Sequence, residues 1–313
     1  MSSGYPALRL VRDEELAAPA RAPADPAAAA APHPVEQQLD ALQQEMEHLR
    51  AEIKLLRHRD ETLNFSMNRI DEELRLAAKL QQDFLPKSMP TLGNVRFHTL
   101  YRPAGYVSGD LYDIVRLDER HVGFYMADAV GHGMPAALLT MFIKNALVTK
   151  EIAEGRYRLL DPAESLTRLN EAMVEQNLSQ ATFATAVYGI IDTQSLVLTY
   201  ARAGHPHPIL MRSDGALLEL DADGGLLGIF SGEQFESRSV QLASGDRLFV
   251  YTDGVELAFG DAAADSEHWR QELRGRRLLD TAKLISDLTE NLDGVSGSLT
   301  PRDDLTMVVA EVL

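Results

Sequence analysis

The sequence predicts an α+β fold in which two antiparallel β-sheets stack face to face with helices on their outer faces, an α-β-β-α sandwich, preceded by a long coiled-coil helix. Three observations support this prediction. Short β-rich runs follow one another from about residue 95 onward, and some are joined by only two or three residues, as antiparallel strands allow. Two helix patterns interrupt these runs in the middle of the chain. A strict heptad pattern occupies residues 39–84.

The composition excludes several classes of protein. The chain has 313 residues, enough for one or two domains, and 45% of them are hydrophobic. A net charge of -17 argues against nucleic acid or an anionic membrane as partner, because both require basic patches. The lack of cysteine excludes disulfides, thiolate metal sites and a cysteine nucleophile. The sequence has no run of about 18 apolar residues and no signal peptide, so we expect a soluble, cytoplasmic protein.

The chain is predicted to have three parts. Residues 1–34 form a tail rich in alanine and proline, and repeated prolines block both helix and sheet, so we expect disorder there. Residues 35–85 form a coiled-coil dimerisation and linker helix. Residues 86–313 form the domain that carries the sheets.

The predicted coiled coil rests on apolar positions spaced alternately by three and four residues from Leu39 to Phe84. Only Asp60 and Gln81 are polar at these positions, and no proline or glycine interrupts the run before Pro86. The alternative is a single amphipathic helix lying on the globular domain, but such helices seldom keep a two-in-seven pattern for so long. We therefore expect a homodimer held by this helix, which Pro86 ends.

Seven strands are predicted from runs of β-branched and aromatic residues. Tight connections at 118–120 and 193–194 favour antiparallel hairpins. The predicted strands are 95–101, 111–117, 121–127, 182–192, 195–201, 247–252 and 305–313.

Helices are predicted at 135–150, 161–178 and 280–292. The first begins with a proline, a favoured residue of the first turn. The second begins with Asp161 and carries an acid three residues later, which is a capping pattern. Residues 260–279 are polar and weakly patterned, so we expect a mobile flap there.

The candidate chemistry lies in aspartates beside glycines at the ends of predicted strands. The sequence contains no G-x-S-x-G elbow, no P-loop and no H-E-x-x-H motif. Carboxylates are hard oxygen donors that suit Mg²⁺ or Mn²⁺, and several of them close together repel one another unless cations lie among them. Each motif alone is a common turn. The aspartates are Asp110 in SGDLYD, Asp128 in DAVGHG, Asp253 in YTDGVE, and Asp303 and Asp304 in DDLT.

Together and in this order, the four motifs resemble the metal-dependent protein phosphatase (PPM, protein phosphatase 2C-like) family. The resemblance is to the bacterial branch that includes the sporulation and stress-response serine phosphatases, and it covers about residues 80–313. Further segments agree with it, namely QQDFLP, YRPA, AGHPHPIL, GLLGIF and GDRLFVYTDG.

The resemblance implies a site with two Mn²⁺ or Mg²⁺ ions, and a third in some relatives. Asp128 would bridge the two ions, with help from the backbone carbonyl of Ala129. Asp110 would bind or orient the ions through their waters. Asp253 and Asp303 would bind one ion on the far side, with Asp304 as a ligand or a neighbour of the ligands. The two ions lower the pKa of a bridging water, and the hydroxide attacks the phosphorus of phosphoserine or phosphothreonine in line.

Five other residues near these motifs are candidates for the site. Four of them have two possible roles each, and the role of the fifth, His207, is open. His132 is a leaving-group acid or a turn residue; His205 faces the metal rim and the substrate or belongs to a proline-locked loop; Arg102 contacts the substrate phosphate or forms a salt bridge; and Glu256 belongs to the outer shell of the metal site or caps a helix.

The resemblance also implies partners. The substrate would be an anti-sigma-factor antagonist phosphorylated on serine. The segment LQQDFLP would begin a switch element packed under the active site, and we expect a separate regulatory protein to bind the coiled coil or the tail. Two alternatives remain open: a catalytically silent dimeric adaptor of the same fold, and a metal phosphohydrolase that acts on small phosphoesters.

Overall fold

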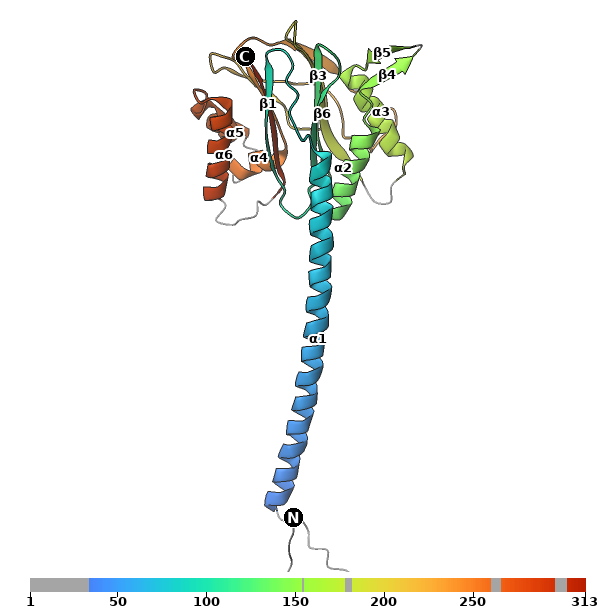
Figure 1. Ribbon diagram of the computed structural model, residues 1–313, viewed down its shortest axis with the longest axis vertical. Helices are drawn as coiled ribbons and strands as arrows, with labels where there is room; N and C mark the ends of the chain where they lie inside the picture. The colour runs from blue at the N-terminus through green and yellow to red at the C-terminus, as the bar shows by residue number, and fades with distance from the viewer. Residues whose placement is uncertain (1–33, 154, 178–181, 260–265, 296–302) are drawn as a thin grey trace, which may run out of the picture. The chain divides into compact units, whose positions relative to one another are not determined.

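The computed structural model describes residues 34–153, 155–177, 182–259, 266–295 and 303–313 (Figure 1). The predicted disordered tail lies outside these ranges, apart from its last residue, Pro34. The chain divides into two compact units, residues 1–66 and 67–313. In the described ranges, no helix has both the length and the apolar character needed to cross a membrane.

The long N-terminal helix is confirmed. Helix α1 (Pro34–Phe84) has 51 residues and stops two residues before Pro86, because proline cannot continue a helix. The apolar side chains of the heptad pattern from Leu39 to Ile70 are about half exposed, as a coiled-coil seam would be in one isolated strand of the coil. The part of α1 from Met67 onward belongs to the same unit as the sheets.

The predicted sandwich of two antiparallel sheets is also confirmed. Sheet A has the strand order β1-β12-β11-β8-β9, and sheet B has the order β10-β7-β6-β3-β2. The strands of sheet A are β1 (Val95–Arg102), β8 (Ile209–Met211), β9 (Leu217–Glu219), β11 (Arg247–Tyr251) and β12 (Leu305–Val312). Those of sheet B are β2 (Asp110–Arg116), β3 (His121–Ala129), β6 (Ala184–Asp192), β7 (Val197–Ala203) and β10 (Ser237–Gln241), and β4 (Lys150–Ala153) and β5 (Arg156–Leu159) form a separate hairpin.

All seven predicted strands are present, and both predicted hairpins pair antiparallel, β2 with β3 and β6 with β7. Five short strands of the described chain, β4, β5, β8, β9 and β10, were not predicted. Four of them have only three or four residues, too few to show an alternating pattern.

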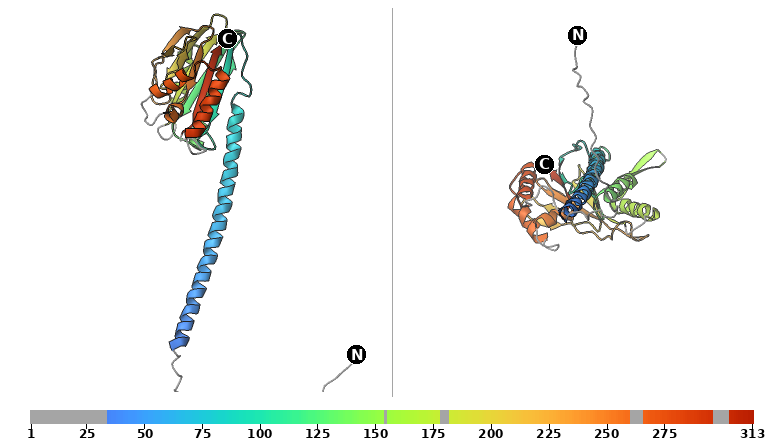
Figure 2. Two further views of the ribbon diagram at one scale, coloured as in Figure 1. Left: turned by 90° about the vertical axis from the view of Figure 1, so that its left-hand side faces the viewer. Right: turned by 90° about the horizontal axis from the view of Figure 1, so that it is seen from below.

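Helices cover both outer faces of the sandwich (Figures 1 and 2). Helices α2 (Met134–Ala146) and α3 (Pro162–Glu175) pack on sheet B, and α4 (Asp253–Phe259) and α6 (Thr281–Val295) pack on sheet A. One group of buried apolar side chains fills the space between the sheets, and a second lies between sheet A, α4, α5 and α6.

Two helix predictions need correction. The helix predicted over 135–150 ends at Ala146, because Leu147 is extended and Lys150 already begins β4. The mobile flap predicted over 260–279 is wrong for α5 (Ser266–Gly275), and residues 260–265 lie outside the described ranges. Trp269 anchors α5: it is fully buried, with the rings of Tyr251 and Phe259 at 5.5 and 5.4 Å. The predicted cap at Asp161 is confirmed, since its side chain accepts the Ala163 N–H.

Candidate active site

Asp110 joins the two sheets at one end of the sandwich. It begins β2 directly opposite Asp128 of β3, and only 2% of its surface is exposed. Its Oδ2 atom accepts hydrogen bonds from Thr252 Oγ1 at 2.9 Å and Thr306 Oγ1 at 2.6 Å, which lie at the ends of β11 and β12 in sheet A. The buried carboxylate of Asp110, which belongs to sheet B, is therefore held in place by hydrogen bonds from sheet A.

Asp304 braces the loop that leads into β2. Its Oδ1 accepts the Ala104 N–H at 2.7 Å, and its Oδ2 accepts the Gly109 N–H at 2.6 Å. Both oxygens thus have a backbone donor, while Asp303 next to it is exposed. The geometry gives Asp304 a positioning role in the loop, while Asp303 accepts the Asp304 N–H through Oδ1 at 2.8 Å.

Gly109 lets this loop approach β3 closely. Its carbonyl accepts the Ala129 N–H at 2.9 Å. A Cβ atom at position 109 would lie 3.0 Å from the Ala129 carbonyl oxygen and 3.2 Å from that of Gly131. Any larger residue would therefore push on the backbone carbonyl that the sequence assigned to the metal site.

Gln81 fixes the same loop from helix α1. Its Oε1 accepts the Ser108 N–H at 2.9 Å, and its Nε2 donates to the Ser108 carbonyl at 2.7 Å and to Thr140 Oγ1 at 3.3 Å. The side chain is 5% exposed. The sequence showed Gln81 only as a polar residue in the heptad pattern, and this exception was the one signal of its role.

The carboxylates raise one another's pKa values. Burial, followed by the charges of Asp253, Asp303 and Asp304, raises the pKa of Asp128 to about 7. Burial and the charge of Asp128 hold the pKa of Asp110 well above its usual range, against the lowering effect of the two threonine hydrogen bonds. Burial and Asp303 also raise the pKa of Asp253. The raised pKa values of Asp110, Asp128 and Asp253 thus show that the aspartates which the sequence singled out lie near enough to influence one another's charge.

This donor set fits hard divalent cations. The charged forms of Asp110, Asp128 and Asp253, whose pKa values are raised, would be stabilised by Mg²⁺ or Mn²⁺ placed among them. Within the described ranges, however, no three acidic or histidine side chains lie close enough to form a ready coordination shell. The carboxylates therefore form an open cluster, whose members interact electrostatically.

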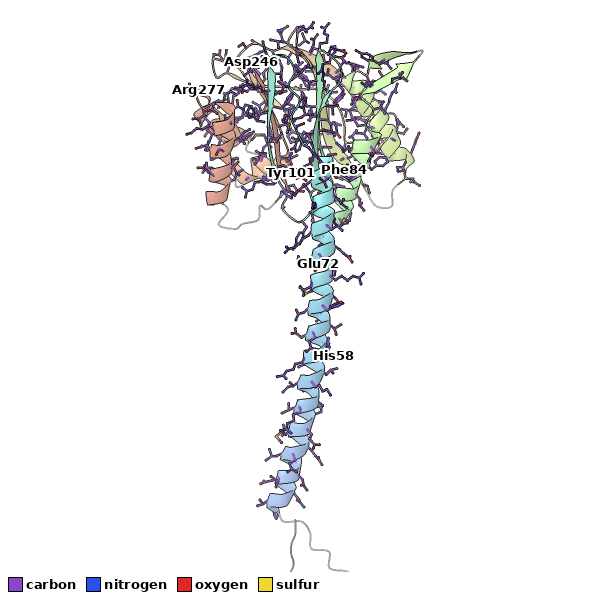
Figure 3. The ribbon with its side chains drawn as sticks, in the orientation of Figure 1. His58, Glu72, Phe84, Tyr101, Asp246 and Arg277 are labelled. Atoms are coloured by element: carbon purple, nitrogen blue, oxygen red, sulfur yellow. The ribbon has the colours of Figure 1, made fainter. Side chains whose placement is uncertain are left out.

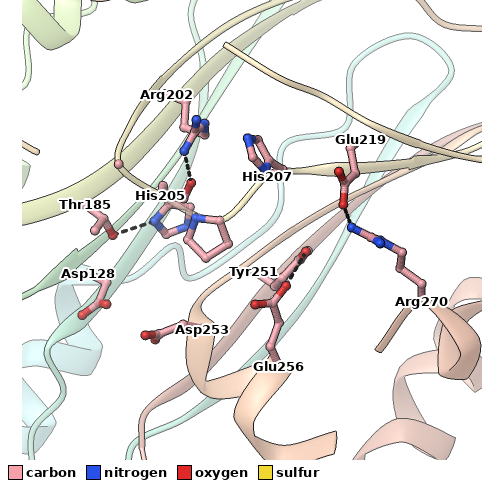
Figure 4. Close-up of a pocket in the computed structure, with 12 residues that line it drawn as sticks. Asp128, Thr185, Arg202, His205, His207, Glu219, Tyr251, Asp253, Glu256 and Arg270 are labelled. Carbon is pink, nitrogen blue, oxygen red and sulfur yellow. Dashed lines mark hydrogen bonds and ion pairs between the residues drawn. The ribbon is translucent and has the colours of Figure 1, made fainter. Parts of the chain in front are cut away.

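A pocket of about 450 Å³ opens beside this cluster (Figure 4). Asp128, Asp253 and Glu256 line it, and Arg202 and Arg270 add positive charge that the sequence did not reveal. Arg202 Nη1 donates to the carbonyl of His205 at 2.7 Å, and Arg270 forms an ion pair with Glu219.

Six of the predicted site residues do not line this pocket, namely Arg102, Asp110, Ala129, His132, Asp303 and Asp304. Arg102 ends β1, where it pairs with Leu305. His132 is exposed in the turn before α2.

His205 lies in the wall of the pocket as a neutral ring. It is 1% exposed, and its Nδ1 is 2.8 Å from the hydroxyl of Thr185, which pairs with Asp128 across the strands. Burial, followed by the charge of Arg202, lowers the pKa of His205 to about 3. The imidazole therefore carries no charge at neutral pH.

Glu256 and His207 lie in the same pocket. Glu256 Oε1 accepts a hydrogen bond from Tyr251 Oη at 3.1 Å, and burial raises the pKa of Glu256. His207 Nε2 is 3.4 Å from Asp221, and burial lowers the pKa of His207. Glu256 belongs to the first turn of α4 and also faces the pocket, so the two interpretations of this residue are compatible.

Comparison with known proteins decides the family. A sequence model of the family described as Stage II sporulation protein E (SpoIIE) matches residues 118–313. The chain belongs to the SpoIIE family. The matched range holds four of the five aspartates, while Asp110 precedes it. The phosphatase resemblance seen in the motifs is confirmed.

Individual members and structures agree with the SpoIIE assignment. Phosphoserine phosphatase RsbP of Bacillus subtilis is 32% identical over 186 residues, which are 58% of this chain and 45% of RsbP. Phosphoserine phosphatase RsbU of the same organism is 31% identical over 196 residues, 62% of this chain and 56% of RsbU. The matches thus span about half the length of these relatives. The SiaA-PP2C domain of Pseudomonas aeruginosa is similar in structure, with a TM-score of 0.67 and 25% identity over 78% of this chain and 97% of that domain.

Proposed function

We propose that the chain is a Mn²⁺- or Mg²⁺-dependent protein-serine/threonine phosphatase that hydrolyses phosphoserine on a partner protein. The observation that carries the proposal is the cluster of aspartates with raised pKa values beside an open pocket. The names of the relatives RsbP and RsbU, both phosphoserine phosphatases, support the same reaction.

The aspartates would hold the cations. Asp128 and Asp253 line the pocket and Asp303 is exposed, so their carboxylates would bind the ions together with the carbonyl of Ala129. Asp110 would orient the ions through their waters, and Asp304 would be a further ligand or keep the loop in place. Two bound ions, or a third as in some relatives, supply a water of lowered pKa and neutralise charge on the phosphoryl group.

Other side chains of the pocket would position the substrate. Arg202 and Arg270 line the pocket and would contact phosphoryl oxygens, Arg270 by exchanging its ion pair with Glu219 for the phosphoryl group. His205 is neutral and can orient a substrate oxygen without attracting the anion. Glu256 would act in the outer shell of the metal site. His132 stays a candidate leaving-group acid and Arg102 a candidate phosphate contact, although neither lines the pocket.

The partner protein would be of the anti-sigma-factor antagonist type, as the family resemblance suggests, and the enzyme would act in the cytoplasm. We expect a homodimer through α1, because the apolar seam from Leu39 to Ile70 is exposed in the single chain. A separate regulatory protein would bind the rod or the tail. Removal of residues 1–75 tests this regulation: unchanged basal activity together with unchanged activation would contradict it.

Turnover of a phosphoserine protein or peptide, with and without Mn²⁺, tests the function. The wild-type chain should release phosphate only with the cation, and Asp128→Ala should abolish release. Glu175→Ala, at the exposed end of α3, is the matched control and should keep full activity. A silent adaptor of the same fold would bind its partner and release no phosphate under any of these conditions.

A further inference from the structure

A second hollow, of about 70 Å³, lies at the other end of the sandwich. Figure 3 shows Arg277 at the end opposite Tyr101. Tyr101 pairs across the strands with Thr306, whose hydroxyl donates a hydrogen bond to Asp110 of the candidate active site. Strand β11 connects the two ends: Arg247 begins it, and Asp253 follows it about 20 Å away at the usual rise per residue. Residues that line the hollow include Arg212, Ser213, Gly215, Gly245, Arg247 and Arg277.

The hollow carries an excess of positive charge. Arg212 is neutralised by the buried Asp246 at 2.6 Å. Arg247 and Arg277 form no ion pair with any carboxylate in the described ranges. The carboxylate of Asp214 also lines the hollow, but it accepts the Ala216 N–H at 2.9 Å within its own turn. Two arginines without acidic partners stand out in a chain whose net charge is -17.

Arg247 also has an unused donor. Its Nη2 donates to the Arg277 carbonyl at 3.2 Å, but its Nη1 is buried and has no acceptor among the described residues. A guanidinium has five N–H donors and no acceptor, and a buried charged donor without a partner is costly. An oxygen-bearing anion would supply the missing acceptor.

Two glycines with positive φ form part of the wall of the hollow, Gly215 with φ of 89° and Gly245 with φ of 86°. A Cβ atom on Gly215 would lie 2.7 Å from Arg277 Cδ, and one on Gly245 would lie 2.9 Å from Ser213 Cβ. The turn between β8 and β9 therefore lies close against Arg277, and the turn before β11 lies close against Ser213 of that turn.

We propose that this hollow binds a phosphate-sized oxyanion between Arg247 and Arg277. Its volume exceeds the roughly 30 Å³ of one water and suits a phosphate, sulfate or phosphoserine headgroup rather than a whole nucleotide. Arginine is the side chain best suited to paired hydrogen bonds with such groups. The group has two possible sources, free phosphate or a phosphoserine side chain of a protein, and both offer the same oxygens.

Binding of inorganic phosphate to the full chain in EDTA tests the site without cations at the candidate active site. Calorimetry and the melting temperature should both report binding for the wild type and for Asp128→Asn. Arg247→Gln and Arg277→Gln should each weaken binding by at least about tenfold, because each loses charged donors. Arg247→Lys, which keeps the charge but loses the paired donors, should fall between them and the wild type.

Arg274→Gln is the matched control, since Arg274 lies on α5 and is paired with Glu267 at 2.7 Å outside the hollow. It should bind phosphate as the wild type does. Sodium chloride at equal ionic strength should give no shift. A phosphoserine peptide on the Asp128→Asn variant identifies the source: binding that depends on the same arginines assigns the site to a protein-borne group, and binding of free phosphate alone assigns it to the free anion. Equal phosphate affinity in wild type, Arg247→Gln and Arg277→Gln, or no binding by the wild type, overturns the proposal.

Discussion

The side-chain amide of Gln81 forms paired hydrogen bonds with both backbone polar groups of Ser108, at 2.9 and 2.7 Å. Ser108 in turn accepts the Asp110 N–H through its hydroxyl at 3.0 Å. One side chain of helix α1 thus determines where the backbone enters strand β2.

Substitution of Gln81 should weaken cation binding more than it changes the fold. Gln81→Ala leaves both groups of Ser108 without partners, at a cost of about 1–3 kcal/mol, and frees the loop that carries Asp110. We expect a higher Mn²⁺ concentration for half-maximal phosphatase activity. Gln82→Ala, the exposed neighbour, is the control. An unchanged Mn²⁺ requirement in Gln81→Ala would show that the loop holds its position without the helix.

The threonine donors to Asp110 should stabilise the domain. Thr306→Val keeps the shape of the side chain but removes a 2.6 Å hydrogen bond to a buried carboxylate. The free energy of unfolding should fall by about 1–3 kcal/mol in a denaturant titration. Thr289→Val removes a helix hydrogen bond on α6 and should cost less. Equal losses for the two variants would argue against the special role of the Asp110 contact.

Gly109→Ala should impair activity through the backbone. The new Cβ would lie 3.0 Å from the Ala129 carbonyl oxygen, so the loop or β3 must shift by a few tenths of an ångström. We expect a loss of kcat of about tenfold or more, with a smaller loss of stability. Gly275→Ala, where a Cβ meets nothing within 4 Å, should behave as wild type. Full activity of Gly109→Ala would mean that the Ala129 carbonyl has no part in the site.

The buried His205 should make the domain sensitive to acid. Its pKa is about 3 in the folded state, below the ordinary value of 6.5, so below pH 6.5 the unfolded chain takes up the proton and the folded chain does not. His205 therefore contributes a loss of stability as pH falls from 6.5 towards 3, at up to about 1.4 kcal/mol per pH unit.

Urea titrations at several pH values, in EDTA, measure this effect. The difference in the free energy of unfolding between wild type and His205→Gln separates the effect of the histidine from that of the carboxylates. This difference should become smaller or change sign as the pH falls. His268→Gln, an exposed histidine on α5, is the control. Parallel stability curves for wild type and His205→Gln would contradict a neutral buried ring.

The heptad seam should hold a dimer. Ile53→Asp places a charge in the seam and should convert the dimer to a monomer in sedimentation equilibrium. Leu55→Asp is the matched control, because Leu55 is also exposed but lies outside the seam. Loss of the dimer in both variants, or in neither, would refute the assignment of the seam.

The sequence was sufficient where the pattern was local and repeated. The strands with clear alternation and the heptad helix were found from spacing alone. The five aspartates were singled out because they stand in four recognisable motifs, and the order of these motifs pointed to the family. Composition also indicated the charge balance correctly.

What the sequence did not reveal depends on distant partners. The helix α5 has a polar sequence, and its stability comes from Trp269 packing between rings of β11 and α4. In the sequence, Gln81 is only a polar exception in the heptad pattern. Its role becomes clear from the structure, where it forms hydrogen bonds with Ser108. Arg202 and Arg270 line the same pocket although they are 68 residues apart in the sequence. No periodic sequence pattern predicts such a contact. Three-residue strands such as β8 form because β11 is already there to pair with them.

The contact of Asp110 with Thr252 and Thr306 affects how mutants of the acidic residues are interpreted. A variant without the Asp110 carboxylate loses the hydrogen bonds between the two sheets as well as an interaction with cations. Loss of activity in such a variant therefore has two explanations. Among the described residues, Asp128 forms no such hydrogen bond with a side chain of the opposite sheet, and Asp253 lines the pocket. Variants of Asp128 and Asp253 are therefore better suited to separate loss of chemistry from loss of folding. Variants of Asp110 test how the two sheets are held together.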